Sequence, residues 1–281
     1  MTTEHYWSEA LERSETAQAS GALVPLTTDL LQLSTDKSLP FELRQLHGFP
    51  PRHLNPEGPK PNPFQPWDQR LEVAPIGNDH VLILNKYPVQ KGHMLLITRD
   101  WAAQAGWLNF ADWSALSAVD RDTSGLWFYN SGPDAGASQP HRHLQLLRRR
   151  STEQICPRMD WFHRRLADLK TTSGSLLENN CVVKERSKSQ HRSDQQALLE
   201  DYLELADRLC LGNPLRNQRP LQAYNMLLTR DWMALIRRRR EGMAGFSING
   251  LGFAGYLLCT KNSDLDWLKR HGPEALLEEV V

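Results

Sequence analysis

The sequence lacks any long apolar segment. No apolar run approaches the roughly 20 residues that a helix needs to cross a bilayer, and the mean hydropathy of the 281-residue chain is -0.54. The first segment, Met1–Glu9, is polar and acidic, without the apolar core of a signal peptide. A membrane protein is therefore excluded in bulk, and no secretory signal is predicted.

Cysteine and net charge are also scarce. The four cysteines are scattered and form no Cys-x-x-Cys pair, which indicates the reduced thiols of a cytoplasmic protein rather than a disulfide or zinc framework. Lysine plus arginine equals aspartate plus glutamate, at 33 each. Without a basic excess, sequence-independent binding to nucleic acid is not expected, and any anion site must be a local cluster.

One segment of the chain combines strand-like and turn-like patterns with polar side chains. The apolar run Gly125–Tyr129 leads into a turn rich in Gly, Pro and Asp, and Arg142–Leu147 then alternates polar and apolar residues. This pattern predicts a strand, a polar loop and a second strand. Because side chains alternate along a strand, one face is expected to carry His141, His143 and Gln145. The opposite face is expected to carry Leu144 and Leu146, with Arg142 at its exposed end.

The residue types on that face suggest group transfer. A neutral imidazole is a strong nucleophile near pH 7, and a loop with glycines, a serine and a glutamine can offer N–H groups and a hydroxyl to phosphate oxygens. A nucleophile beside such a loop favours transfer of a phosphoryl or nucleotidyl group through a covalent histidine intermediate. Two other interpretations stay open: His-x-His can hold zinc, and two histidines can be hydrogen-bonded for structure alone.

The segment Gly136–Gln145 resembles the active-site signature of the diadenosine tetraphosphate phosphorylases, or ATP adenylyltransferases. These enzymes form part of the histidine-triad superfamily, in the branch of galactose-1-phosphate uridylyltransferase. Gln145 stands where the hydrolase branches carry a third histidine. Further similar segments are Leu84–Pro88, Gly92–Arg99, Tyr224–Arg230 and Ser247–Gly255, in the family's order. The resemblance covers most of the chain, from about Lys60 to Lys261.

The resemblance implies phosphorolysis of diadenosine tetraphosphate to ATP and ADP, with inorganic phosphate as acceptor. His143 would attack the α-phosphorus, His141 would orient the strand and loop, and Gln145 would donate to a non-bridging oxygen. No tightly bound cofactor and no protein-held metal are expected, although Mg²⁺ could accompany the polyphosphate. The expected substrate-binding residues are Lys60, Asn85, Lys86, Asn130, Gly136, Ala137, Ser138, Gln139, Gln145, Asn249, Gly250, Leu251 and Lys261.

Three rival functions differ in chemistry. A uridylyltransferase would use the same scheme on a sugar phosphate, but its signature is His-Pro-His, whereas Arg142 separates the histidines here. A histidine-triad hydrolase would send water to the intermediate, and Gln145 argues against that. A zinc-binding or nucleotide-binding protein without enzymatic activity is the alternative from another class.

The predicted fold is α+β, a histidine-triad-like antiparallel sheet with flanking helices, duplicated as two related halves. The echo of Leu96–Trp101 in Leu227–Trp232 is the sequence sign of that duplication. Two arginine clusters, Arg148–Arg150 and Arg237–Arg240, are candidates for polyphosphate binding. The expected parts are an extension over 1–55, a catalytic half over 56–168, a linker or loop over 169–193 and a non-catalytic half over 194–281.

Overall fold

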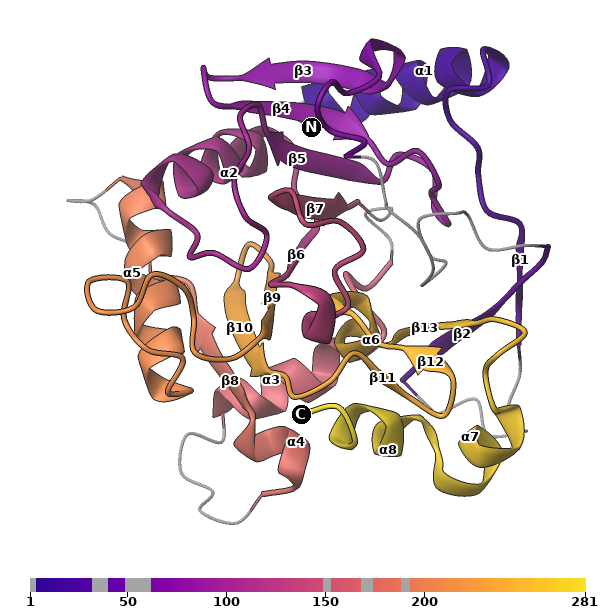
Figure 1. Ribbon diagram of the computed structural model, residues 1–281, viewed down its shortest axis with the longest axis vertical. Coiled ribbons are helices and arrows are strands. Elements are labelled where there is room, and N and C mark those ends of the chain that lie inside the picture. The colour runs from indigo at the N-terminus through magenta and orange to yellow at the C-terminus, as the bar shows by residue number, and fades with distance from the viewer. Residues whose placement is uncertain (1–3, 32–39, 49–61, 149–152, 168–173, 188–192) are drawn as a thin grey trace.

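The fold is built on one eight-stranded sheet. The computed structural model describes residues 4–31, 40–48, 62–148, 153–167, 174–187 and 193–281. All neighbouring strands of the large sheet are antiparallel, in the order β3-β4-β5-β7-β6-β9-β10-β8 (Figure 1). Its strands are β3 (Glu72–Ile76), β4 (His80–Leu84), β5 (Met94–Thr98), β6 (Leu126–Asn130), β7 (His143–Leu147), β8 (Cys181–Glu185), β9 (Tyr224–Leu228) and β10 (Trp232–Arg237).

Helices cover the two faces of this sheet (Figure 1). One face packs against α1 (His5–Ala19), α2 (Phe110–Asp122) and α5 (Asp194–Arg208). The other side carries α3 (Met159–Ala167), α4 (Leu176–Asn179), α6 (Gly250–Ala254), α7 (Leu265–His271) and α8 (Pro273–Glu278). No helix within the described ranges is both long and apolar enough to cross a bilayer.

Shorter elements complete this second side. Strand β2 (Glu42–Leu46) pairs with β1 (Thr28–Leu30) and, in parallel, with β13 (Tyr256–Cys259). A small hairpin joins β11 (Gly242–Met243) to β12 (Phe246–Ser247). Two 3-10 turns lie at Gln69–Leu71 and Pro133–Ala135.

Strand alternation divides the core in two. On β6, Trp127 and Tyr129 join the core beneath α2 and α5, whereas Leu126 and Phe128 join the core on the opposite side. On β7, Leu144 and Leu146 belong to the first core. Their alternating neighbours His143 and Gln145 therefore belong to the face that carries α6, as a two-residue period requires.

The strand, polar loop and strand expected between Gly125 and Leu147 are present as β6, a loop that contains the 3-10 turn Pro133–Ala135, and β7. The α+β class with a large antiparallel sheet and flanking helices is confirmed.

The segment expected as a linker or loop, 169–193, contains α4 and the edge strand β8, which pairs with β10 over its whole length. The four-part division of the chain stays a prediction.

The duplication also stays a prediction, but the topology contains a repeat. The run β5, α2, β6, β7 gives the strand order β5-β7-β6, and the run β8, α5, β9, β10 gives β8-β10-β9. The echo in the sequence does not follow this repeat, because Leu96–Trp101 begins on β5 and Leu227–Trp232 begins on β9. These two strands occupy different places in the two runs, so the echo is not evidence for the duplication.

A buried ion pair fixes α2 to the signature strand. Asp112 is 1% exposed and accepts from Arg142 Nη1 at 2.9 Å and from His80 Nε2 at 3.0 Å. The same carboxylate closes the capping box of α2 by accepting from the Asn109 N–H at 2.8 Å. The expectation that Arg142 lies at an exposed end was wrong, because this partner from another element buries it.

We predict that Asp112→Ala lowers the free energy of unfolding by about 3–5 kcal/mol, because it leaves a buried guanidinium without its carboxylate. Asp207→Ala is the control: Asp207 is exposed on α5, and its loss should change stability by less than about 0.5 kcal/mol. Urea unfolding of the two variants gives the comparison. Equal, small losses would show that the buried pair does not stabilise the fold.

Candidate active site

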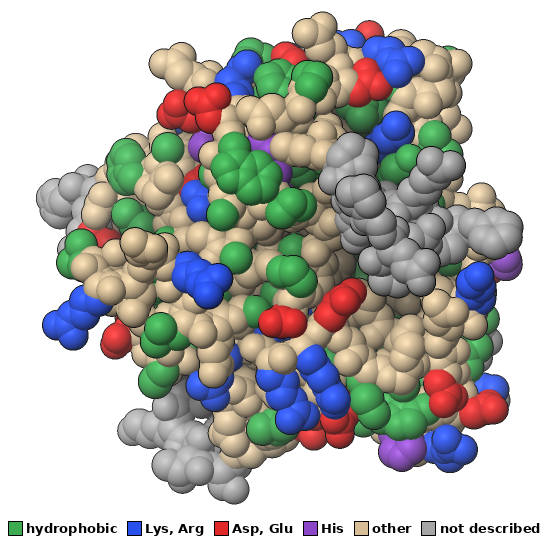
Figure 2. Space-filling model, in the orientation of Figure 1, with side chains coloured by type: hydrophobic (Ala, Val, Ile, Leu, Met, Phe, Trp, Pro, Cys, Tyr) green, Lys and Arg blue, Asp and Glu red, His purple; other side chains and the backbone are tan. Residues whose placement is uncertain are grey.

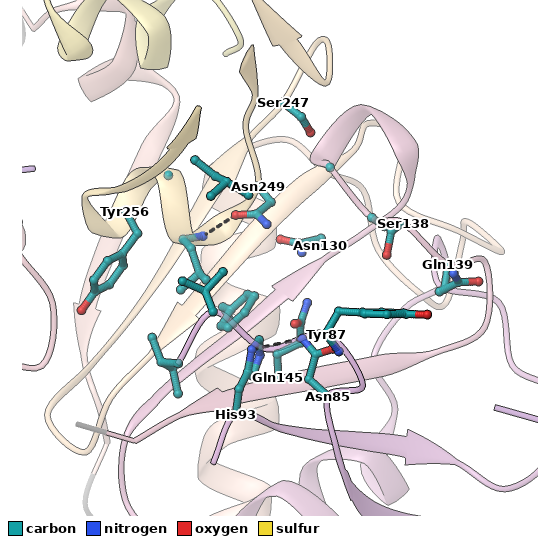
Figure 3. A pocket seen from close by; sticks show the side chains of 18 of the residues that line it. Asn85, Tyr87, His93, Asn130, Ser138, Gln139, Gln145, Ser247, Asn249 and Tyr256 are labelled. Carbon is teal, nitrogen blue, oxygen red and sulfur yellow. Dashed lines mark hydrogen bonds between the residues drawn. The ribbon is translucent and has the colours of Figure 1, made fainter. Parts of the chain in front are cut away.

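A large open cavity lies over the α6 side of the sheet. Its volume is about 1870 Å³, and its lining comes from distant parts of the chain. Figure 3 shows Asn85, His93 and Gln145 gathered at one end and Asn130, Ser138 and Asn249 at the other. The cavity therefore brings together β6 and β7 from the first part of the chain and α6 from the second.

The expected phosphate loop lines this cavity, but only some of its N–H groups are available. Gly136 and Ala137 donate their backbone N–H groups within the turn, to Pro133 O at 2.7 Å and to Gly132 O at 3.0 Å. The N–H groups of Ser138 and Gln139 have no acceptor among the described residues. The two donors left for a ligand anion are therefore those of Ser138 and Gln139.

Gly136 also explains why the loop needs a glycine. Its φ is +79, and an added Cβ would lie 2.7 Å from Ile248 O and 2.9 Å from Asn249 Cβ. The backbone of the loop thus touches the segment that begins α6. This close approach makes one cavity wall from both parts of the chain.

His143 is held in a defined tautomer. Its Nδ1 lies 2.8 Å from His141 O, and a carbonyl can only accept, so Nδ1 carries the hydrogen and Nε2 keeps its lone pair. Nε2 has no hydrogen-bond partner among the described residues. Gln104 Oε1 accepts from the His143 backbone N–H at 2.8 Å and fixes the start of the strand.

His141 has both ring nitrogens occupied. Its Nε2 lies 2.9 Å from the Thr98 carbonyl oxygen, so Nε2 carries the hydrogen, and Nδ1 then accepts from Asn62 Nδ2 at 2.9 Å. This ring has no free lone pair within the described structure, unlike the ring of His143. The geometry favours a supporting place for His141 and leaves His143 as the available nucleophile.

Burial keeps these rings neutral. Loss of hydration lowers the pKa of His143 to about 4 and that of His93 to about 4, and it also lowers the pKa of His141. At neutral pH the His143 ring is therefore unprotonated, as a nucleophile must be.

Neither motif histidine lines the cavity itself. His143 is 4% exposed, and the Phe64 ring packs against it with ring centroids 5.3 Å apart. Phe64 also packs against His141, at 5.7 Å. Gln145, two residues further along the same face, does line the cavity.

The end of the cavity near Gln145 contains a residue that the sequence analysis had not selected. His93 is buried, its Nδ1 accepts from Asn85 Nδ2 at 3.2 Å, and its Nε2 has no partner by geometry among the described residues. Figure 3 shows Gln145 beside this ring. Asn85 lines the cavity as expected, whereas Lys86 does not: its ammonium lies 5.7 Å from the centre of the Tyr87 ring.

The substrate-binding residues expected from the second part of the chain also differ in whether they line the cavity. Asn249, Leu251 and Lys261 line the cavity, as expected. Gly250 does not line it, and instead donates its N–H to Asn130 Oδ1 at 2.8 Å beneath the wall. Lys60 lies outside the described residues.

The arginine clusters behave differently from each other. In the first, Arg148 lines the cavity and pairs with Glu4 at 2.8 Å; Arg149 and Arg150 lie outside the described residues. None of the second cluster lines the cavity. Arg237 donates to Asn180, Arg239 and Arg240 pair with Glu279, and Arg238 is buried.

The face shown in Figure 2 has no separate patch of basic side chains, because Lys and Arg are interspersed there with Asp and Glu. Across the described ranges, no group of three or more His, Cys, Asp or Glu side chains is placed to hold a metal ion. The arrival of Mg²⁺ with a polyphosphate stays a prediction.

Gln104 and Asn62 were also missed by sequence reasoning. Gln104 Nε2 donates to Asn130 O at 2.8 Å while its Oε1 holds the His143 N–H, so one amide joins both strands of the signature. Asn62 fixes the His141 tautomer. Neither residue has a spacing that marks it, because each acts across a tertiary contact.

Comparison with known proteins identifies the family of the chain. The family described as "Ap4A phosphorylase N-terminal domain" matches residues 1–157, and "ATP adenylyltransferase C-terminal domain" matches residues 162–281. Saccharomyces cerevisiae "Protein APA1" is 28% identical over 90% of this chain and 86% of its own length. "Diadenosine 5',5'''-P1,P4-tetraphosphate phosphorylase 2" of the same yeast is 27% identical over 77% of this chain and 74% of its own.

Solved structures show the same fold. Yeast Ap4A phosphorylase Apa2 superposes with a TM-score of 0.72 at 22% identity, covering 99% of this chain and 96% of that one. The structure of Apa2 in complex with Ap4A gives 0.70 at 23% identity, with the same coverage. Since the first family match alone spans more than half of the sequence, the chain belongs to the Ap4A phosphorylase (ATP adenylyltransferase) family.

Proposed function

We propose that this protein catalyses the phosphorolysis of diadenosine tetraphosphate (Ap4A) to ATP and ADP, by reversible nucleotidyl transfer through an adenylyl group on His143. The observation that carries the proposal is the contrast between the two motif histidines. His143 keeps a free lone pair on Nε2, whereas both ring nitrogens of His141 are engaged. Family membership supplies the substrate class, and this contrast supplies the nucleophile.

The first half-reaction forms one bond and breaks one. Nε2 of His143 attacks the α-phosphorus, the bond from that phosphorus to its bridging oxygen breaks, and ATP leaves with the electron pair. Because a polyphosphate is stable as an anion, the leaving group needs no strong general acid. The Nδ1–H of His143 stays hydrogen-bonded to His141 O, which stabilises the positive charge that the ring acquires.

The surrounding donors fit the charge that develops on phosphorus. Ser138, Gln139 and Gln145 all line the cavity, and the N–H groups of the first two and the amide of the third can donate to the non-bridging oxygens as charge builds on them. An oxygen of inorganic phosphate then attacks the adenylyl phosphorus, the bond from that phosphorus to Nε2 breaks and returns its electron pair to the ring, and ADP is released. Since inorganic phosphate, the group displaced in the reverse direction, is a stable anion like ATP, the reaction is reversible.

A cytoplasmic location is also part of this proposal. The four cysteines, Cys156, Cys181, Cys210 and Cys259, are free thiols in the structure, and three of them are buried. This arrangement agrees with a cytoplasmic location.

The acceptor can be tested by product analysis. Ap4A should be consumed continuously only when phosphate is present, and ATP and ADP should then form in equal amounts. Chromatography of the reaction with and without phosphate gives the answer. Rapid release of AMP in the absence of phosphate would mean that water is the acceptor, and the protein would be a hydrolase.

The nucleophile can be tested by comparing two variants. His143→Ala should lower kcat by on the order of 10⁴ to 10⁶, because it removes the group that forms the covalent intermediate. His141→Ala should cost less, since it removes support and no bonding atom. Wild-type protein mixed with labelled Ap4A alone should retain an acid-labile, base-stable AMP. Activity that survives in His143→Ala, or label that maps to His141, would overturn the assignment.

The pH dependence follows from the buried ring. With a pKa of about 4 for His143, about 90% of the rings are neutral at pH 5, whereas an ordinary value near 6.5 would leave about 3% neutral. Only the neutral ring attacks, so activity should be lost as pH falls through about 4. The measurement is the second-order rate constant for ATP release in a single turnover without phosphate, which reports the free enzyme. An acid limb at pH 6 to 7 would contradict the neutral, buried His143.

A further inference from the structure

Three buried polar side chains form a line from the second arginine cluster to the cavity. Arg238 is 2% exposed and donates from Nη1 to Asn225 Oδ1 at 2.5 Å. Asn225 is fully buried and donates from Nδ2 to Asn130 Oδ1 at 2.8 Å. Asn130 lines the cavity, where Figure 3 shows it between Asn249 and Ser138.

The direction of every bond in this line is fixed by its ends. Arg238 can only donate, so the atom of Asn225 that faces it is the oxygen. The Ala135 carbonyl can only accept, and Asn225 Nδ2 lies 2.8 Å from it. The backbone N–H of Gly250 can only donate, so the Asn130 atom 2.8 Å away is Oδ1. In both amides, the positions of the oxygen and the nitrogen therefore follow from partners that can only donate or only accept.

As a consequence, the side-chain oxygen of Asn130 accepts two hydrogen bonds, whereas its NH₂ group remains available to donate. Oδ1 accepts from both Asn225 and Gly250, while Nδ2 has no acceptor among the described residues. An amide whose oxygen is held from behind presents its N–H bonds toward the open side, which here is the cavity. Such a donor suits an anionic oxygen of a phosphate group.

Arg238 has no carboxylate in direct contact among the described residues. Its other donors go to the main-chain oxygens of Val280, Arg240 and Glu241 at 2.8–3.2 Å. Its only side-chain acceptor in that set is the Asn225 amide. Since a charged donor polarises the amide that accepts from it, the positive charge strengthens the next donor in the chain, and then the next.

We propose that Arg238 and Asn225 are positioning residues that aim the Asn130 amide at the substrate phosphates. The inference rests on the proposed function, because it concerns the same cavity and the same phosphate-bearing ligand. Asn225 also holds Ala135, next to the phosphate loop, and Asn130 holds Gly250, at the start of α6. This chain of hydrogen bonds from Arg238 through Asn225 to Asn130, here called the relay, thus fixes both walls of the phosphate site relative to each other.

The test compares a ligand that has a phosphate with one that lacks it. In Arg238→Met, AMP should bind about tenfold more weakly than to wild type, because the donor to its phosphate is no longer fixed. Adenosine should bind within about twofold of wild type. Arg239→Met is the matched control, since Arg239 is an exposed neighbour paired with Glu279. It should leave both affinities unchanged. Titration calorimetry of the full chain gives all of these constants.

Two further variants keep the test decisive if Arg238→Met folds poorly. Asn225→Asp keeps the shape and the contact with Arg238 but replaces the donor to Asn130 and Ala135 by an acceptor, so AMP affinity should fall while the protein stays folded. Arg238→Lys retains a charged donor and should recover part of the AMP affinity. A structural role alone would lower the melting temperature and leave the AMP-to-adenosine ratio at its wild-type value.

The outcomes separate this inference from the proposed function. If wild type binds AMP more tightly than adenosine and the folded variants keep that ratio, the relay is refuted and the phosphorolysis proposal stands. If the variants lose AMP and adenosine equally, the relay is again refuted. If wild type forms no ATP and ADP from Ap4A and phosphate, the proposed function fails, and the relay then falls with it.

Discussion

The backbone pairing of β6 with β9 is the constraint on which the cavity depends. This pairing runs from Trp127 opposite Leu228 to Asn130 opposite Asn225, and it joins the strands of the first part of the chain to those of the second in one sheet. Because the register is fixed and side chains alternate, it decides which residues face the cavity and which face α2 and α5. A slip of β9 by one residue would turn Asn225 toward the core beneath α2 and α5 and away from Asn130. The two asparagines meet at the last pair of this ladder, where the phosphate loop begins.

The reactive ring depends on a second constraint, which is burial without a counter-charge. Desolvation lowers the pKa of His143, and no carboxylate of the described residues hydrogen-bonds its ring to raise that pKa again. A carbonyl partner on Nδ1 fixes the tautomer without this electrostatic cost, whereas an aspartate there would favour the protonated ring. In the same buried region the Phe64 ring packs against His143, with ring centroids 5.3 Å apart.

The sequence was sufficient for features that depend on local pattern. The continuous apolar run of β4 and the alternation along β7 are properties of adjacent residues, and the signature loop is a contiguous motif. Features that depend on tertiary partners were missed. Arg142 looked exposed because its partner Asp112 lies on α2, and β8 was assigned to a linker because its five residues stand in a polar region and are paired on one edge only. Lys86 was placed near the nucleotide by resemblance, yet its ammonium lies over Tyr87. Asn225 could not be recognised as a partner of Asn130, since only the sheet register brings them together.

Because the chain has as many acidic as basic residues, the way in which it would bind a polyphosphate needs a physical explanation. Cations that line the cavity are largely paired with carboxylates: Arg44 with Glu42, Lys91 with Glu15 and Arg148 with Glu4. The groups nearest the signature are instead neutral donors, namely the N–H groups of Ser138 and Gln139 and the amides of Asn130 and Gln145. Neutral dipoles held in place by the fold stabilise charge without reorganising as it moves from one phosphate oxygen to another. A cluster of unpaired cations would bind substrate and transition state alike, and would hold the ATP product as firmly as it held the substrate. In the proposed reaction, oriented neutral donors, backed by the buried guanidinium of Arg238, would stabilise the transferring adenylyl group while still allowing a highly charged product to leave.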